Sequence, residues 1–187
     1  MKRTLDQILA YHCAPTLEGI KPANLISLSQ KEFPDLEEQL EDYRQFFAPK
    51  GVAFRTMCIC GRNVLLLVYR PSELERTLCA PLAAALLRGD GYAPEQGLSA
   101  MLDRLGLRLG REREFPHEIG LFLGYPPEDV ADFQRHKGQN CKLCGHWKVY
   151  SDVERARDLF QRYDRCRKKL CAQLAAGMTL RQLFPAA

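Results

Sequence analysis

The chain alternates between segments with apolar residues at helical spacing and shorter segments with the pattern of strands. Helical spacing predicts helices over Thr4–Cys13, Pro34–Phe47, Pro71–Gly89 and Pro94–Leu109. Pro15 is expected to end the first of these, because proline cannot donate the backbone hydrogen bond of a helix interior. Pro81 predicts a kink or a restart in the third.

Strand-like segments are concentrated in the first half of the chain. Val52–Ile59 and Asn63–Arg70 are separated by a short break that contains glycine, which favours a hairpin. Val64–Tyr69 is continuously apolar, the pattern of a strand buried on both faces, so it is expected in the middle of a covered sheet. Lys21–Ser29 is expected to be a loop that turns into a short strand.

The second half of the chain is predicted to be mostly helical. Pro116 can open a helix that ends before Pro127, and a further helix is expected over Pro127–His136. His146–Tyr150 alternates as a strand does, and Ser151 begins a capping box for a long helix down to Gly177. Three or four strands among several helices predict an α/β (α+β) fold with a small, mostly antiparallel sheet, as one domain over residues 1–187.

Composition and charge narrow the classes of function. The 187 residues are 46% hydrophobic, and the net charge of +4 is spread along the chain, which argues against a nucleic-acid partner. The N-terminus lacks the pattern of an export signal, and the apolar runs are shorter than the ~20 residues of a bilayer-spanning helix. A cytoplasmic protein without a membrane partner is expected, and its eight cysteines are expected to be reduced thiols.

The stretch from Phe115 to Tyr150 carries most of the residues able to perform chemistry. It contains three of the four histidines, the single tryptophan and the pair Cys141 and Cys144. We therefore expect any functional site to involve this stretch.

Cys141 and Cys144, followed by a glycine, have the spacing of a metal knuckle. Tetrahedral zinc or iron needs four ligands, so this knuckle is half a site. His146 and Cys166 are candidates for the remaining ligands, as is His117. The alternative is that these thiols are buried or merely reactive and bind no metal.

Other cysteines also bear on this metal hypothesis. Cys58 and Cys60 share one face of a predicted strand, because side chains two apart point the same way, and they resemble a second half-site. Cys166 and Cys171 diverge by about 140° around a helix that turns about 100° per residue, so at most one of them can join the knuckle.

A cysteine nucleophile is a second hypothesis. Cys13 would supply the thiol, His117 the base and Glu118 the group that orients the base. His12 is poorly placed to activate its neighbour Cys13, because adjacent helical residues point about 100° apart. The alternative for His117 is a helix cap or a buried hydrogen-bonding role.

Trp147 and Tyr150 offer aromatic surface for a flat cofactor such as a flavin or a haem, although such aromatics commonly pack in the core. A third hypothesis is a structural or interaction protein, with a protein partner and no site chemistry. It predicts that no concave pocket is lined by the residues from Phe115 to Tyr150.

Several segments together resemble an uncharacterised bacterial family of unknown function that is familiar from clostridia and other anaerobes. The segments are His12–Leu17, Lys21–Leu25, Leu65–Arg70, Phe115–Pro126 and Trp147–Tyr150. The resemblance covers nearly the whole chain and implies no activity, ligand or catalytic residue. It suggests a cytosolic protein of an anaerobe, and the residues favour an accessory role that handles zinc, iron or a redox cofactor through cysteine thiols.

Overall fold

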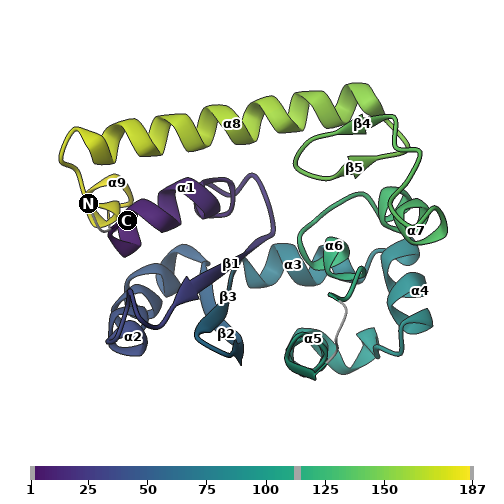
Figure 1. The fold of residues 1–187 in the computed structure, drawn as a ribbon, viewed down its shortest axis with the longest axis horizontal. Coiled ribbons are helices and arrows are strands. Elements are labelled where there is room, and N and C mark those ends of the chain that lie inside the picture. Colours follow the sequence, from purple (N-terminus) through teal and green to yellow (C-terminus); the bar gives the residue numbers. More distant parts are fainter. Residues whose placement is uncertain (1–2, 112–114, 186–187) are drawn as a thin grey trace.

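The computed structural model describes residues 3–111 and 115–185, which form a single α+β domain (Figure 1). Three strands, β1 (Ala23–Ser29), β2 (Ala53–Cys60) and β3 (Asn63–Tyr69), form an antiparallel sheet in the order β1-β3-β2. The predicted hairpin of β2 and β3 is confirmed. So is the central position of β3, whose apolar side chains are covered on both faces.

Helices cover both faces of this sheet and create two apolar clusters. One face packs against α1 (Leu5–Leu17), α2 (Leu36–Phe47), α8 (Val153–Ala175) and α9 (Leu180–Leu183). The other face packs against α3 (Pro71–Leu78), α4 (Pro81–Gly89), α5 (Gly97–Arg111), α6 (Ile119–Phe122) and α7 (Pro127–Arg135). Two short 3-10 helices, η1 (Ala48–Lys50) and η2 (Pro94–Gln96), join neighbouring elements.

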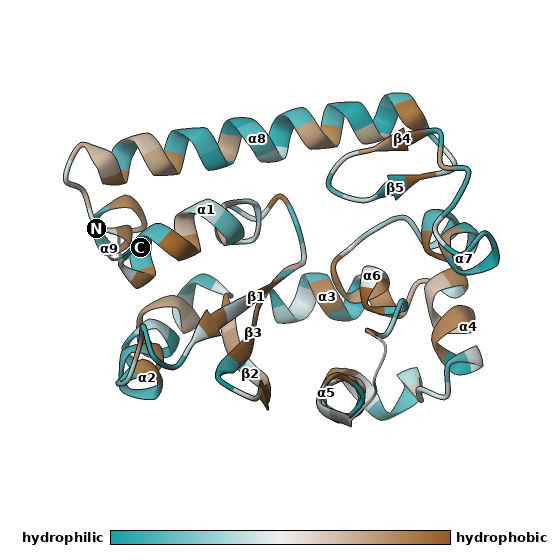
Figure 2. Cartoon of the chain, viewed as in Figure 1, coloured by the Kyte–Doolittle hydropathy of each residue, from teal (hydrophilic) through white to brown (hydrophobic). Residues whose placement is uncertain are grey.

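The long helix α8 lies along α1 and reaches beyond it to a second, smaller sheet (Figure 1). That sheet is a hairpin of β4 (Leu143–Cys144) and β5 (Lys148–Val149). Hydrophobic and polar residues alternate along α8 (Figure 2), which is the pattern of a helix that buries one side. No helix in the described part of the chain is long and apolar enough to cross a bilayer.

Several predicted boundaries were wrong. The first helix continues through Pro15 to Leu17, since a proline in the last turn costs only one backbone hydrogen bond. The helix predicted from Pro116 is reduced to the single turn of α6. The cap of α8 is Asp152 rather than Ser151, because the Asp152 carboxylate accepts the backbone N–H of Arg155. Pro81 does restart the helix, as α4.

Two glycines on α5 let this helix approach β2 closely. A Cβ atom at Gly106 would lie 2.9 Å from the backbone oxygen of Met57, and one at Gly110 would lie 3.5 Å from the Cβ atom of Cys58. Gly106 and Gly110 are four residues apart and so share one face of the helix. This face therefore fixes how the end of β2 lies against α5.

Gly106→Ala is expected to lower the free energy of unfolding by about 1–3 kcal/mol, because the new methyl group must displace backbone. The matched control is Gly89→Ala on α4, where a Cβ atom would meet nothing within 4 Å. That change is expected to be neutral or to stabilise by about 0.5–1 kcal/mol through helix propensity. Urea denaturation followed by circular dichroism measures both, and equal effects at the two positions would contradict the close approach.

Candidate functional site

A pocket of about 430 Å³ lies between the segment around α6 and α7 and the β4–β5 hairpin. All of its lining residues fall between positions 115 and 148, so both halves of the stretch singled out in the sequence contribute. They are mostly apolar or aromatic: Phe115, Pro116, His117, Ile119, Gly120, Leu123, Tyr125, Asp129, Val130, Phe133, Cys144, Gly145, Trp147 and Lys148. The expectation that no pocket would be lined by this stretch, which followed from a purely structural role, was wrong.

Stacked aromatic rings hold the hairpin side of the pocket in place. The rings of Trp147 and Tyr125 stack, with centroids 5.1 Å apart, and Phe160 of α8 meets Trp147 edge-on at 4.5 Å. A Cβ atom at Gly145 would lie 2.2 Å from the Phe160 ring, so this position needs a glycine for the hairpin to lie against α8. This wall of the pocket is therefore packed against α8.

A buried carboxylate joins α7 to the hairpin. Asp129 is 2% exposed, and its Oδ2 atom accepts a hydrogen bond from the indole N–H of Trp147 at 2.7 Å. Its Oδ1 atom accepts the backbone N–H groups of Tyr150 at 2.9 Å and Ser151 at 2.7 Å. The carboxylate thus ties the two walls of the pocket together, and its oxygens are engaged by the protein itself.

Three other polar side chains lie on the pocket wall. The His117 ring is exposed and lies edge-on to Phe133, with centroids 5.1 Å apart. The Lys148 ammonium donates to the backbone oxygen of Gly138 at 2.6 Å, and the Cys144 thiol is exposed. The pocket therefore combines an apolar interior with an imidazole, an ammonium group and a thiol.

Glu118 does not orient His117, contrary to the prediction. The Glu118 side chain is buried, with 2% exposed, whereas His117 is exposed at the surface. Glu118 Oε1 accepts the hydroxyl of Tyr92 at 2.8 Å and pairs with Arg108 Nη1 at 2.5 Å. Burial and this carboxylate raise the pKa of Tyr92. Glu118 is therefore a packing residue that links α5, the connection between α4 and η2, and the start of α6.

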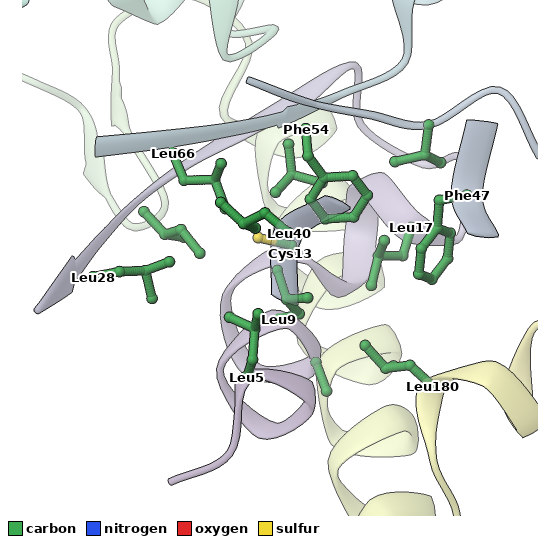
Figure 3. Close-up of a cluster of buried hydrophobic side chains, with 14 of the residues drawn as sticks. Leu5, Leu9, Cys13, Leu17, Leu28, Leu40, Phe47, Phe54, Leu66 and Leu180 are labelled. Atoms are coloured by element: carbon green, nitrogen blue, oxygen red, sulfur yellow. The ribbon is translucent and has the colours of Figure 1, made fainter. Parts of the chain in front are cut away.

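Cys13 lies in the apolar core between α1, α2 and the sheet (Figure 3). It has no exposed surface, and burial raises the pKa of its thiol to about 12. A nucleophilic cysteine needs the opposite, an accessible thiol with a lowered pKa. His117, exposed at the pocket, belongs to a different part of the fold, so the predicted pair of Cys13 and His117 is not supported.

The predicted metal ligands are spread over three surroundings. Cys144 lines the pocket, and Cys141 is half-buried at the start of the hairpin. His146 pairs with Asp164 at 3.2 Å, and burial lowers its pKa in spite of that carboxylate. Cys166 packs in the core beside α1, where burial raises the pKa of its thiol to about 11.

Within residues 3–111 and 115–185, no group of three or more cysteine, histidine or acidic side chains is arranged to hold a metal ion. The eight cysteines are free thiols. Cys58 and Cys60, considered as a second half of a metal site, lie at the end of β2 beside α5. Metal binding through the knuckle is therefore not confirmed.

The two predicted cofactor-stacking aromatics differ in position. Trp147 lines the pocket, whereas Tyr150 is 6% exposed and its ring stacks on His136 with centroids 5.8 Å apart. The hydroxyl of Tyr150 has no hydrogen-bond partner in the described part of the chain. Sequence reasoning missed Tyr125, Asp129 and Phe133. The one available signal was the indole N–H of Trp147, which requires an acceptor when it is buried.

Comparison with known proteins identifies the family without naming an activity. No curated protein and no solved structure matches the chain. A family model described as "Protein of unknown function (DUF3793)" matches residues 9–184. The match covers nearly the whole chain, and the protein therefore belongs to this family of unknown function.

Proposed function

We propose that the protein binds a small, flat and largely apolar molecule in the pocket between α6, α7 and the β4–β5 hairpin. The observation that carries this proposal is the pocket itself, with a volume of about 430 Å³ and a lining dominated by aromatic and aliphatic side chains. Sites for small ligands typically have volumes of about 300–1,000 Å³, apolar walls and a few polar groups that fix orientation.

The polar groups favour a ligand that carries an acidic group. Lys148 contributes a positive charge to the wall of the pocket. Its ammonium group has three N–H donors, and one of them makes the hydrogen bond to the Gly138 oxygen. The carboxylate of Asp129 is already occupied by its bonds to Trp147, Tyr150 and Ser151, so it is a poor partner for a cationic ligand. Planar aromatic side chains such as Phe133 favour flat partners.

The binding assay can use Trp147 as an internal reporter, because it is the single tryptophan of the chain and lies on the pocket wall. Anilinonaphthalene sulfonate, a flat anionic probe, is expected to change the Trp147 emission on titration. Phenylnaphthylamine, its uncharged analogue, is expected to bind more weakly, because it has no acidic group for Lys148. Equal affinity for the two probes would support an apolar binding pocket but contradict the proposal that the ligand carries an acidic group.

Leu123→Phe is expected to weaken binding of the anionic probe at least about tenfold, because the larger ring fills space that the ligand needs. Leu123 lines the pocket. The matched control is Leu107→Phe on α5, at a side chain that is 53% exposed and outside the lining. Fluorescence titration measures both variants. Unchanged affinity in Leu123→Phe, or an equal loss in Leu107→Phe, would overturn the proposed site.

A thiol-bound metal is a second candidate, favoured by the position of Cys144 on the pocket wall with Cys141 in the same hairpin. Soft thiolates suit zinc or iron, and a ligand in the pocket or a further donor would have to complete the coordination. Anaerobically purified protein is expected to contain stoichiometric metal that Cys144→Ser loses. A wild-type protein that contains no metal and is as stable as Cys144→Ser would reject this candidate and leave the apolar-ligand proposal intact.

A further inference from the structure

Two thiols face each other at the end of β2, away from the pocket. The Sγ atoms of Cys58 and Cys60 lie 2.8 Å apart, and the Sγ atom of Cys60 also lies 3.7 Å from the backbone oxygen of Leu109 on α5. Cys60 is exposed, whereas Cys58 is half-buried against the apolar cluster of α5. The pair is therefore open to solvent through Cys60.

An irregularity in β2 places both thiols on the α5 side of the sheet. The register with β3 shifts between Thr56 and Cys58, so Met57 is an extra residue in the strand. Such a bulge re-aims the side chains that follow it. Met57 and Cys58 consequently both pack against the α5 cluster, although neighbours in a regular strand point to opposite faces. Cys60 follows Cys58 onto the same side.

The strand geometry allows these thiols to bond, at a cost. Two residues along a strand span roughly 6.4–6.8 Å, the upper end of the ~4.4–6.8 Å separation of Cα atoms found across disulfides. A bond between Cys58 and Cys60 would therefore be strained, and strained, exposed disulfides are readily reduced. This arrangement is typical of an exchangeable disulfide rather than a structural one.

We propose that Cys58 and Cys60 form a thiol–disulfide exchange site whose oxidant is a small disulfide and whose reductant is the matching small thiol. The exposed Cys60 attacks first. Its thiolate bonds to one sulfur of the small disulfide, the disulfide bond breaks, and the released thiolate takes up the proton that Cys60 lost.

Cys58 then resolves the mixed disulfide. Its sulfur attacks the Cys60 sulfur, the bond between Cys60 and the small thiol breaks, and the second thiolate leaves with the Cys58 proton. In total the two protein thiols lose two electrons and two protons, and one small disulfide becomes two small thiols. Burial and the neighbouring Cys60 raise the pKa of Cys58, so the Cys58 thiol stays protonated and Cys60 is the sulfur that attacks the small disulfide first.

The test uses the full chain, oxidised glutathione as the probe, alkylation of the remaining thiols and peptide mapping by mass spectrometry. The expected product is lighter by two hydrogens, with Cys58 and Cys60 protected from alkylation, and excess reduced glutathione reverses it. Cys58→Ser is expected to stop at a stable mixed disulfide on Cys60. In Cys60→Ser, Cys58 is expected not to react with oxidised glutathione and to be alkylated.

Cys79 is the internal control in the same experiment, because it is an exposed thiol outside the pair. It can form a mixed disulfide but should not yield a protein lighter by two hydrogens. The proposal is overturned if Cys58 and Cys60 are both still free to be alkylated after Cys79 has reacted with oxidised glutathione. It is also overturned if the disulfide maps to Cys141 and Cys144 instead. Because the wild type gives the decisive reading, a variant that fails to fold does not affect it.

Discussion

Asp129→Ala is expected to lower the free energy of unfolding by about 3–5 kcal/mol, because it leaves buried donors without an acceptor. The lost bonds are those from the Trp147 indole and from the backbone N–H groups of Tyr150 and Ser151. The Trp147 indole and the Tyr150 N–H lie in buried surroundings, since these residues are 7% and 6% exposed, whereas Ser151 is exposed. Urea denaturation followed by circular dichroism measures the global effect, and Trp147 fluorescence reports the hairpin separately.

The matched control for this prediction is Asp132→Ala on the same helix. Asp132 makes an ion pair with Arg135, whose side chain is 70% exposed, so its removal is expected to change stability by at most about 0.5 kcal/mol. Asp129→Asn keeps one carbonyl oxygen as an acceptor and should lose only part of the stability. A loss in Asp129→Ala no larger than in Asp132→Ala would show that the carboxylate does not hold the hairpin.

The position of Asp129 also explains how the pocket depends on the fold. One wall of the pocket comes from α7, and the other comes from a hairpin of two-residue strands, which is too short to be stable alone. The Asp129 hydrogen bonds and the contact of Trp147 with Phe160 supply the stability that the short hairpin lacks on its own. A mutant that loses the Asp129 bonds is therefore expected to lose probe binding together with stability.

The main sheet could be predicted from the sequence because its signals are local. The continuously apolar run in β3 and the glycine-containing break before it are visible within a few residues. The hairpin of β4 and β5 could not be assigned in the same way. Only the β5 side was expected as a strand, from the alternation over His146–Tyr150, because the two residues of β4 are too few to show such a pattern.

The helix expected from Pro116 failed because a contact distant in sequence ends it. Gly124 has a φ of +72°, a conformation that favours glycine, and a Cβ atom there would lie 2.4 Å from Pro22. Pro22 precedes β1, about a hundred residues earlier, so nothing in the local sequence shows this close approach. The chain turns at Gly124 instead of continuing a helix towards Pro126.

The difference between local sequence signals and contacts distant in sequence also separates the site residues that were predicted from those that were not. His117, Cys144 and Trp147 were expected at a site and do line one pocket. Glu118 was expected to orient His117, yet its carboxylate is held by Tyr92 and Arg108 from distant segments. Residue type and position along the chain indicated where the site lies. The direction of each side chain depended on tertiary contacts that one sequence does not show.

The second large effect concerns Lys21, a buried lysine between α1 and β1. Lys21 is 6% exposed, and its Nζ atom lies 5.2 Å from the centroid of the Tyr125 ring and 5.8 Å from that of Tyr163. Burial lowers the pKa of Lys21 from 10.5 to about 8, although the nearby Cys13 thiol opposes this shift. Its charge also contributes to the lowered pKa of His146. The free energy of unfolding is therefore lowered at every pH at which Lys21 is buried in its charged form.

The sign of the pH dependence follows from this lowered pKa. Between pH about 8 and pH about 10.5 the unfolded chain binds a proton at Lys21 that the folded chain does not, so the unfolding free energy rises with pH. The penalty is complete below pH 8 and disappears as the pH approaches 10.5. Cys13 and Tyr125, each with a pKa of about 12, stay neutral over most of this range.

Lys21→Met removes the buried charge and should remove this pH dependence with it. The stability of Lys21→Met relative to the wild type is expected to fall by about 3 kcal/mol as the pH rises from 8 to 10.5. Comparing the two proteins at each pH cancels the titration of groups that they share. Lys142→Met is the control, because it replaces an exposed lysine of the hairpin and keeps the buried Lys21, so this variant should retain the rise in stability between pH 8 and pH 10.5. Denaturant unfolding at intervals across this range measures all three proteins. A constant difference between Lys21→Met and the wild type would mean that Lys21 keeps its proton as easily in the folded chain as in the unfolded one.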